Sequence, residues 1–175
     1  TLPCYETIAH LEGKGNYALR KYYVWPYRFF YRHKLKMILS LMDKPIYQNI
    51  LDFGSGPGIF TNELQKRGIS VKSYEPDEPI DYRWKFDLII CASVLEFTSL
   101  YYTLTSIRQL MSRTSTLIIS SPMQTGFSQV YFNLIKDANH RNSHTEIVSQ
   151  VSKYFRIEKY KEWLGLYFAL RAKML

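Results

Sequence analysis

The segment ILDFGSGPG, at residues 50–58, restricts more than any other feature what this chain can fold into. A short apolar run with an acidic residue near its end comes first, then three glycines at alternate positions, then a segment with the apolar spacing of a helix. Glycine lets the backbone turn sharply and approach a ligand without a Cβ atom in the way, and the start of a helix offers free N–H groups. The segment therefore predicts a buried strand, a ligand-binding loop and a helix in direct succession.

The spacing of these glycines excludes two common nucleotide sites. A dinucleotide loop requires G-x-G-x-x-G, but Ile59 stands where the third glycine belongs, and no Gly-Lys-Ser/Thr ends the loop as a P-loop requires. Glu75 ends the next predicted strand, 21 residues after Gly54. A carboxylate at that place can accept hydrogen bonds from both hydroxyls of a ribose. The pattern favours an adenosine-bearing ligand that has no pyrophosphate.

Strand and helix patterns alternate along the rest of the chain. Short apolar or alternating runs predict strands at 47–53, 69–75, 86–91, 116–120, 156–163 and 166–174. Longer runs with helical spacing predict helices at 27–42, 59–67, 99–111, 129–138 and 145–154. This alternation is typical of βαβ units, so we expect a single α/β domain with a Rossmann-like, doubly wound and mostly parallel sheet.

The first predicted helix, at 27–42, contains both apolar and basic residues. Its apolar face is expected to hold Phe30, Leu35, Ile38, Leu39 and Met42. Its basic residues, Arg28, Arg32, Lys34 and Lys36, are expected mostly elsewhere on the helix.

The charge of the chain lies at its two ends. The formal net charge of +8 divides into +5 for residues 1–45, −1 for 46–152 and +4 for 153–175. No apolar run reaches the ~20 residues of a membrane-spanning helix, and the two cysteines, Cys4 and Cys91, have no metal-type spacing. We therefore expect a cytoplasmic protein.

Taken together, these motifs resemble the class I S-adenosylmethionine-dependent methyltransferases, and most closely the small-molecule, "type 11" enzymes of the ubiquinone-biosynthesis kind. ILDFGSGPG is similar to the glycine-rich first motif of that family, FDLIICASVLEF at 86–97 to its fourth strand and following loop, and LIISSP at 117–122 to its fifth strand. The strands at 156–174 match the antiparallel hairpin that closes the fold.

The resemblance implies S-adenosylmethionine as cofactor and assigns its contacts. The glycine loop would pack against the methionine part, Asp52 would reach the amino group through water, Glu75 would bind the ribose, and the loop after the fourth strand would lie beneath the sulfonium. The cofactor-binding residues implied in this way are Asp52, Gly54, Ser55, Gly56, Gly58, Glu75, Pro76, Cys91, Ala92 and Ser93. For Cys91, a buried apolar role is favoured over that of a nucleophile.

The interval from Glu75 to Asp87 departs from the family pattern because it has only twelve positions and contains Pro76 and Pro79. The family uses this interval for a helix, a third strand and a second helix, but one crossover alone needs a dozen or more residues. We therefore expect the third strand to be missing or vestigial and the strand at 69–75 to be a sheet edge. The adenine would be more exposed, or covered by the N-terminal segment or another subunit.

Methyl transfer from a sulfonium is an in-line displacement, and it needs a base only if the acceptor must lose a proton. The candidates for that role are Glu96, which is in the loop nearest the expected sulfonium, and His140 and His144, with Tyr131 as a further one. The two histidines are four residues apart but lack a third ligand with recognisable spacing, so we expect no metal.

The segment YALRKYYVWPYRFFYRHK mixes basic and aromatic residues and contains no acid. The family resemblance favours a helical lid over residues 1–45, in front of a methyltransferase domain at 46–175. A peripheral membrane contact and RNA binding remain open for the same segment. CASVLEF is not the Asn/Asp-Pro-Pro-aromatic motif of amino-directed DNA enzymes, so no DNA partner is expected.

Three functions are therefore open. The first is transfer of a methyl group to a small-molecule or lipid-like acceptor. The second is methylation of RNA, and the third is a non-catalytic relative that binds S-adenosylmethionine. An oligomer is compatible with all three.

Overall fold

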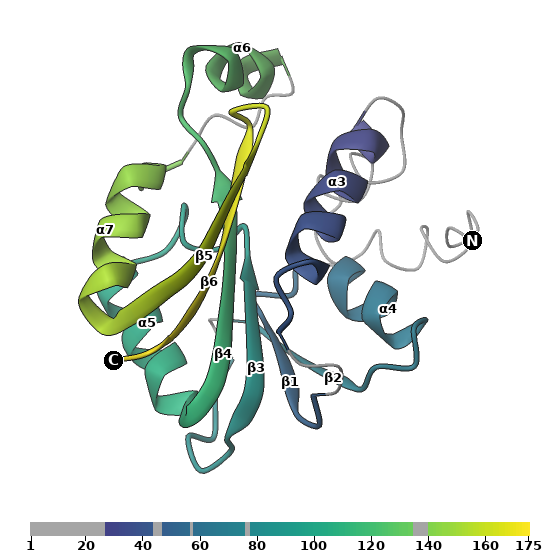
Figure 1. Cartoon of the computed structure of the whole chain (residues 1–175), viewed down its shortest axis with the longest axis vertical. Helices are drawn as coiled ribbons and strands as arrows, with labels where there is room; N and C mark the ends of the chain where they lie inside the picture. Colours follow the sequence, from purple (N-terminus) through teal and green to yellow (C-terminus); the bar gives the residue numbers. More distant parts are fainter. Residues whose placement is uncertain (1–26, 44–46, 57, 76–77, 135–139) are drawn as a thin grey trace.

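The computed structural model describes residues 27–43, 47–56, 58–75, 78–134 and 140–175, but not the side chains of Tyr27 and of residues 131–134 (Figure 1). The strands are β1 (Ile50–Phe53), β2 (Val71–Tyr74), β3 (Phe86–Ala92), β4 (Met111–Pro122), β5 (Phe155–Trp163) and β6 (Tyr167–Met174). The helices are α3 (Tyr27–Leu39), α4 (Ile59–Gln65), α5 (Leu100–Leu110), α6 (Gly126–Leu134) and α7 (His144–Tyr154).

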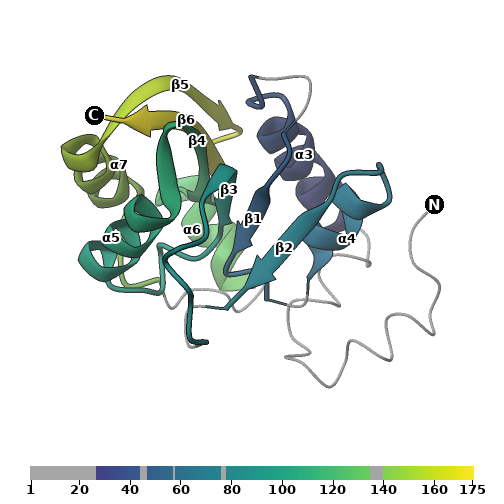
Figure 2. The same cartoon turned by 90° about the horizontal axis from the view of Figure 1, so that it is seen from below.

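The strands form one six-stranded sheet in the order β2-β1-β3-β4-β6-β5. β2, β1, β3 and β4 run parallel to one another, whereas β6 runs antiparallel to both β4 and β5. Helices α3 and α4 cover one face, α5 and α7 cover the other, and α6 lies beyond the end of β4 (Figures 1 and 2). The expected Rossmann-like α/β fold with a C-terminal antiparallel hairpin is confirmed.

The core has two halves because side chains alternate across the central strands. On β3, Leu88 and Ile90 point into the layer beneath α3 and α4, while Ile89 and Cys91 point into the layer beneath α5 and α7. All four side chains are fully buried. A sheet covered on both faces requires such continuous apolar strands.

The short interval after β2 contains no strand in its described part, residues 78–85. The Tyr74 hydroxyl donates a hydrogen bond to the Glu78 carbonyl over 3.0 Å, and the ammonium group of Lys72 lies 3.8 Å from the centre of the Trp84 ring. The strand order places β2 at the edge of the sheet, as expected, and Trp84 packs beside it.

The buried face of α3 differs from the predicted one. Lys34, Met37 and Ile38 are buried there, as is Leu41 just beyond the end of the helix, whereas the other apolar residues assigned to the face are only partly buried. The expectation that Lys34 lies elsewhere was wrong, since only 1% of its surface is exposed. The helix has apolar residues on more than one side, so its rotation is decided by its packing on β4 and β6.

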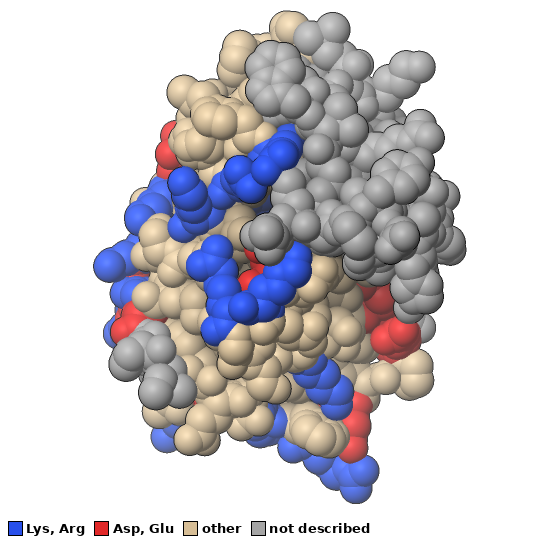
Figure 3. All heavy atoms as spheres, turned by 90° about the vertical axis from the view of Figure 1, so that its right-hand side faces the viewer, with Lys and Arg blue, Asp and Glu red and all other residues tan. Residues whose placement is uncertain are grey.

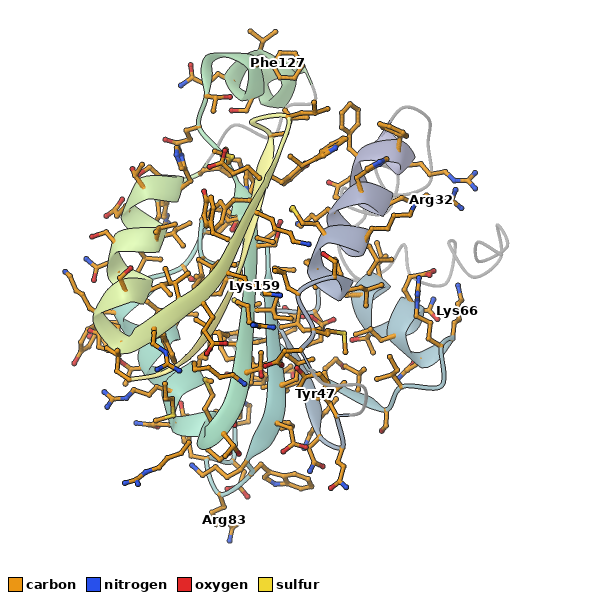
Figure 4. All side chains as sticks on the ribbon, in the orientation of Figure 1. Arg32, Tyr47, Lys66, Arg83, Phe127 and Lys159 are labelled. Carbon is orange, nitrogen blue, oxygen red and sulfur yellow. The ribbon has the colours of Figure 1, made fainter. Side chains whose placement is uncertain are left out.

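Basic side chains gather on the outside of the molecule, on the side that carries α3 and α4 (Figure 3). Arg32 points outward from α3, in contrast to Lys34 (Figure 4). The edge strand β5 also exposes Lys159 and Lys161, and lysine on an edge opposes pairing with another chain. In the part of the chain described, no helix has the length and apolar character needed to cross a membrane.

Candidate functional site

The glycine loop is tied to the end of β2 by its main chain. The N–H groups of Gly54 and Ser55 donate to the Tyr74 carbonyl over 2.7 and 3.2 Å. Gly54 has a φ of 74°, and a Cβ atom there would lie 2.3 Å from Cγ2 of Val94. Glycine at this position therefore lets the loop after β1 pack directly against the loop after β3.

Gly56 and Gly58 also have positive φ angles, 53° and 72°, but the space beside them is open. Gly58 is the N-cap of α4 and has no side chain to cap it. Asp52 serves instead, because its Oδ2 atom accepts hydrogen bonds from N and Oγ1 of Thr61 over 3.1 and 2.8 Å. Burial raises the pKa of Asp52 to about 6, against the opposing effect of the Thr61 bonds.

Glu75 reaches back to the glycine loop from the end of β2. Its Oε1 atom accepts a hydrogen bond from Oγ of Ser55 over 2.8 Å and another from N of Gly56. The predicted ribose-binding acid and the glycine loop are thus neighbours in space. Pro76, which was predicted with them, lies outside the described residues.

The chain turns sharply where β3 ends. Ser93 has a φ of 58°, which is unusual for a residue other than glycine, and its N–H donates to the Ser120 carbonyl over 2.8 Å. Ala92 and Ser93 are partly exposed, but Cys91 is fully buried among the core residues of the α5 and α7 layer. Burial raises the pKa of the Cys91 thiol well above its usual value, so the thiol is held in its neutral form.

Glu96, three residues further on, is a buried carboxyl group with 1% of its surface exposed. Its Oε2 atom accepts a hydrogen bond from Oγ of Ser121 over 2.9 Å, whereas its Oε1 atom is buried with no hydrogen-bond partner in the described structure. Burial raises the pKa of Glu96 to about 7, although Lys34, Ser121 and Ser93 favour the charged form. A carboxyl group with such a pKa can exchange a proton near neutral pH.

Lys34 is the site residue that sequence reasoning missed. Its Nζ atom donates a hydrogen bond to Oγ of Ser93 and lies 5.3 Å from the centre of the Tyr167 ring. The positive charge lowers the pKa of both Asp52 and Glu96 relative to burial alone. The available signal was the spacing of Lys34, Met37, Ile38 and Leu41, which places the lysine in a helical stripe of apolar residues.

The two candidate histidines have separate surroundings. The rings of His140 and Phe97 pack edge to face with 5.3 Å between their centroids. The backbone N–H of Gln124 donates a hydrogen bond to Nδ1 of His144 over 3.2 Å. Within the described residues, no group of three His, Cys, Asp or Glu side chains could hold a metal ion. The side chain of Tyr131, the further candidate base, lies outside the described residues.

The segment that follows His140 holds the Glu96 loop in place through hydrogen bonds to its carbonyl groups. The N–H groups of Arg141 and Asn142 donate to the Glu96 carbonyl over 2.8 and 3.3 Å. Nδ2 of Asn142 donates to the carbonyls of Leu95 and Thr98 over 2.6 and 2.8 Å. His140 therefore belongs to the same side of the molecule as Glu96.

Comparison with known proteins agrees with this geometry. A family model described as "Methyltransferase domain" matches residues 25–167. The chain belongs to this methyltransferase family. No curated protein sequence matches the chain significantly.

Solved structures with low sequence identity share the methyltransferase fold. A possible histamine N-methyltransferase from Thermotoga maritima, named as S-adenosylmethionine-dependent, gives a TM-score of 0.67 at 15% identity over 95% of this chain and 99% of that one. The N-methyltransferase NodS of Bradyrhizobium japonicum, bound to S-adenosylhomocysteine, gives 0.60 at 15% identity over 96% and 98%. Human N-acetylserotonin methyltransferase, bound to S-adenosylmethionine, gives 0.62 at 15% identity over 99% of this chain and 60% of that one.

Proposed function

We propose that this methyltransferase binds S-adenosylmethionine over the glycine loop and transfers its methyl group to a small-molecule or lipid-like acceptor. The observation that carries the proposal is the convergence of the glycine loop, Glu75 and the Glu96 loop at the carboxyl ends of the parallel strands β1, β2 and β3. Ligands bind at this end of open α/β sheets. The likeness of the motifs to small-molecule enzymes supports the choice of acceptor.

The residues present fit such a cofactor. Space is open beside Gly56 and Gly58, where side chains would otherwise stand over the loop. Glu75 is already directed at the loop, so one of its oxygens can orient Ser55 and Gly56 while the carboxylate accepts from ribose hydroxyls. Asp52 lies beneath the loop and supplies negative charge for the amino group.

When bound, S-adenosylmethionine supplies a methyl group on a cationic sulfur. The chain contributes orientation and proton transfer: Ser93 and the turn around it hold the end of β3 against β4, and Glu96 lies in the same loop with one unpartnered oxygen. We assign to Glu96 the role of accepting a proton from the acceptor at Oε1. His140 and His144 are the alternative bases. Of the two, His140 is linked to the Glu96 loop, because its ring contacts Phe97 and the two residues after it donate hydrogen bonds to the Glu96 carbonyl.

Isothermal titration calorimetry with S-adenosylmethionine and S-adenosylhomocysteine tests the cofactor assignment. The wild-type chain should bind both, and Glu75→Ala should weaken binding by about tenfold or more through loss of the ribose contact. Glu78→Ala is the matched control, because that carboxylate is exposed in the same segment. Absence of binding to folded wild-type protein, or equal loss in both variants, would contradict the proposal.

A further inference from the structure

The buried ammonium group of Lys34 and the buried carboxyl group of Glu96 meet at Ser93. Lys34 donates a hydrogen bond to the Ser93 hydroxyl, and that hydroxyl also favours the charged form of Glu96. Lys34 and Glu96 each expose only 1% of their surface. Ser93 itself is partly exposed, so this pair of opposite charges lies directly behind an accessible residue of the proposed site.

One atom of this arrangement calls for a hydrogen-bond donor. Oε2 of Glu96 accepts a hydrogen bond from Ser121, whereas Oε1 is buried and has no hydrogen bond of regular geometry among the described residues, although the Ser93 hydroxyl is near enough to favour the charged form. A buried carboxylate oxygen left unpaired is costly, and a catalytic role is one of the reasons for which native proteins keep such a group. An O–H or N–H group of an acceptor would satisfy Oε1.

The positive charge of Lys34 favours a hydroxyl group over an amine as the acceptor. An aliphatic amine approaches as an ammonium ion, which Lys34 repels, and an aromatic amine remains neutral and gains little from the charge. A hydroxyl group that loses its proton becomes an oxyanion, which Lys34 attracts. A preorganised cation in a site with little water stabilises such a developing charge strongly.

The surroundings favour a flat acceptor. Phe97, which follows Glu96 directly, exposes 42% of its surface, and the ring of His140 stands against it at an interplanar angle of 63°. The Tyr167 ring, which is itself buried, lies 5.3 Å from the Lys34 ammonium and helps to hold it in place. Aromatic side chains of this kind offer edges and faces to an aromatic ligand.

We propose that the acceptor of this site is an acidic hydroxyl group, such as a phenol or an enol, and that Lys34 determines this specificity by holding its oxyanion. The inference rests on the proposed methyl transfer. The acceptor O–H bond breaks and its proton passes to Oε1 of Glu96. The acceptor oxygen then bonds the methyl carbon as the bond from that carbon to sulfur breaks, and the electron pair of that bond stays on sulfur, which becomes a neutral thioether.

The test uses two probes of similar shape, 4-nitrophenol and 4-nitroaniline, added to the full chain saturated with S-adenosylhomocysteine. Absorbance separates phenolate from phenol, so the ionisation of the bound probe is measured without turnover. The wild-type chain should bind 4-nitrophenol at least about tenfold more tightly than 4-nitroaniline and should shift the bound probe toward phenolate. Lys34→Met should abolish both effects, and Lys34→Arg should restore part of them.

Lys36→Met is the matched control, since Lys36 is exposed on the same helix. It should leave the preference unchanged. Circular dichroism and retained binding of S-adenosylhomocysteine establish that each variant is folded. The inference is overturned if folded wild-type protein fails to bind 4-nitrophenol, binds 4-nitroaniline equally well, or keeps its preference in Lys34→Met. Failure to bind S-adenosylhomocysteine in the first place would instead contradict the proposed function.

Discussion

The ammonium group of Lys34 donates a hydrogen bond to the hydroxyl group of Ser93, which lies 59 residues further along the chain. This bond joins α3, the first helix of the described residues, to the turn at the end of β3. It brings a buried positive charge next to the loop that carries Glu96. Helix α3 thus reaches a candidate site whose other residues lie in the loops that follow β1, β2 and β3.

Removal of the Lys34 charge should shift the pH dependence of methyl transfer. Glu96 must be ionised to accept a proton, so the rate in the wild-type chain should rise with pH around its pKa of about 7. In Lys34→Met the attraction that favours the carboxylate is lost, and the midpoint should move to higher pH. A rate profile measured with a methylated phenol as product tests this, and a midpoint that stays in place would contradict it.

Glu96 should make the folded protein less stable as the pH rises. Its pKa is raised from 4.5 to about 7, so the folded state binds more protons than the unfolded state between these values. The stabilisation is complete below about pH 4.5 and is lost as the pH passes about 7. The free energy of unfolding, measured with urea at several pH values across this range, should fall less steeply with pH in Glu96→Gln than in the wild-type chain. The exposed control Glu78→Gln should not change this dependence on pH. Asp52, with a pKa raised to about 6, accounts for part of the slope that remains.

Gly54→Ala should destabilise the fold more than Gly68→Ala. Both glycines have a φ near 75°, so both alanines carry a similar backbone cost. Only at Gly54 does the added Cβ meet another residue, Val94, whereas nothing lies within 4 Å at Gly68. The difference in free energy of unfolding should be about 1–3 kcal/mol. Val94→Ala should recover part of it in the double variant, and equal losses in the two single variants would count against a contact between the loops.

Cys91→Ala should leave methyl transfer nearly unchanged, within about twofold, because the thiol is buried and neutral and no covalent intermediate is required. The free energy of unfolding of this variant should be about 1 kcal/mol lower than that of the wild-type chain, because packing around the thiol is lost. Mass spectrometry after mild alkylation of the native protein should find Cys91 unmodified. Rapid modification of Cys91, or a large loss of rate in a folded variant, would point to a role for the thiol that the fold does not suggest.

The sequence predicted the parts of the site that depend on short segments. Alternate glycines after a strand and Glu75 at the end of the next one are local patterns, and both lie where the patterns indicated. That residues 78–85 form no strand could be predicted from the length of the interval after Glu75 and its two prolines. Element ends were less accurate: β4 extends back to Met111, directly after α5, because Met111 already pairs with Phe86 of β3, although the regular pairing begins only at Thr116.

The contribution of Lys34 could not be predicted in the same way. Helical spacing shows which residues share a face but not how a helix is rotated on the sheet, and α3 has apolar residues on more than one side. The environment of Glu96 also depends on residues far away in the sequence, such as Ser121 and the segment at 141–142. Such contacts are decided by tertiary packing.

Hydrogen–deuterium exchange, measured by mass spectrometry with and without saturating S-adenosylhomocysteine, tests most directly whether the cofactor site lies where we place it. We predict slower exchange in peptides that contain residues 54–58, 71–75 and 92–97. Protection confined to other parts of the chain, or no change in these three segments at saturation, would contradict it.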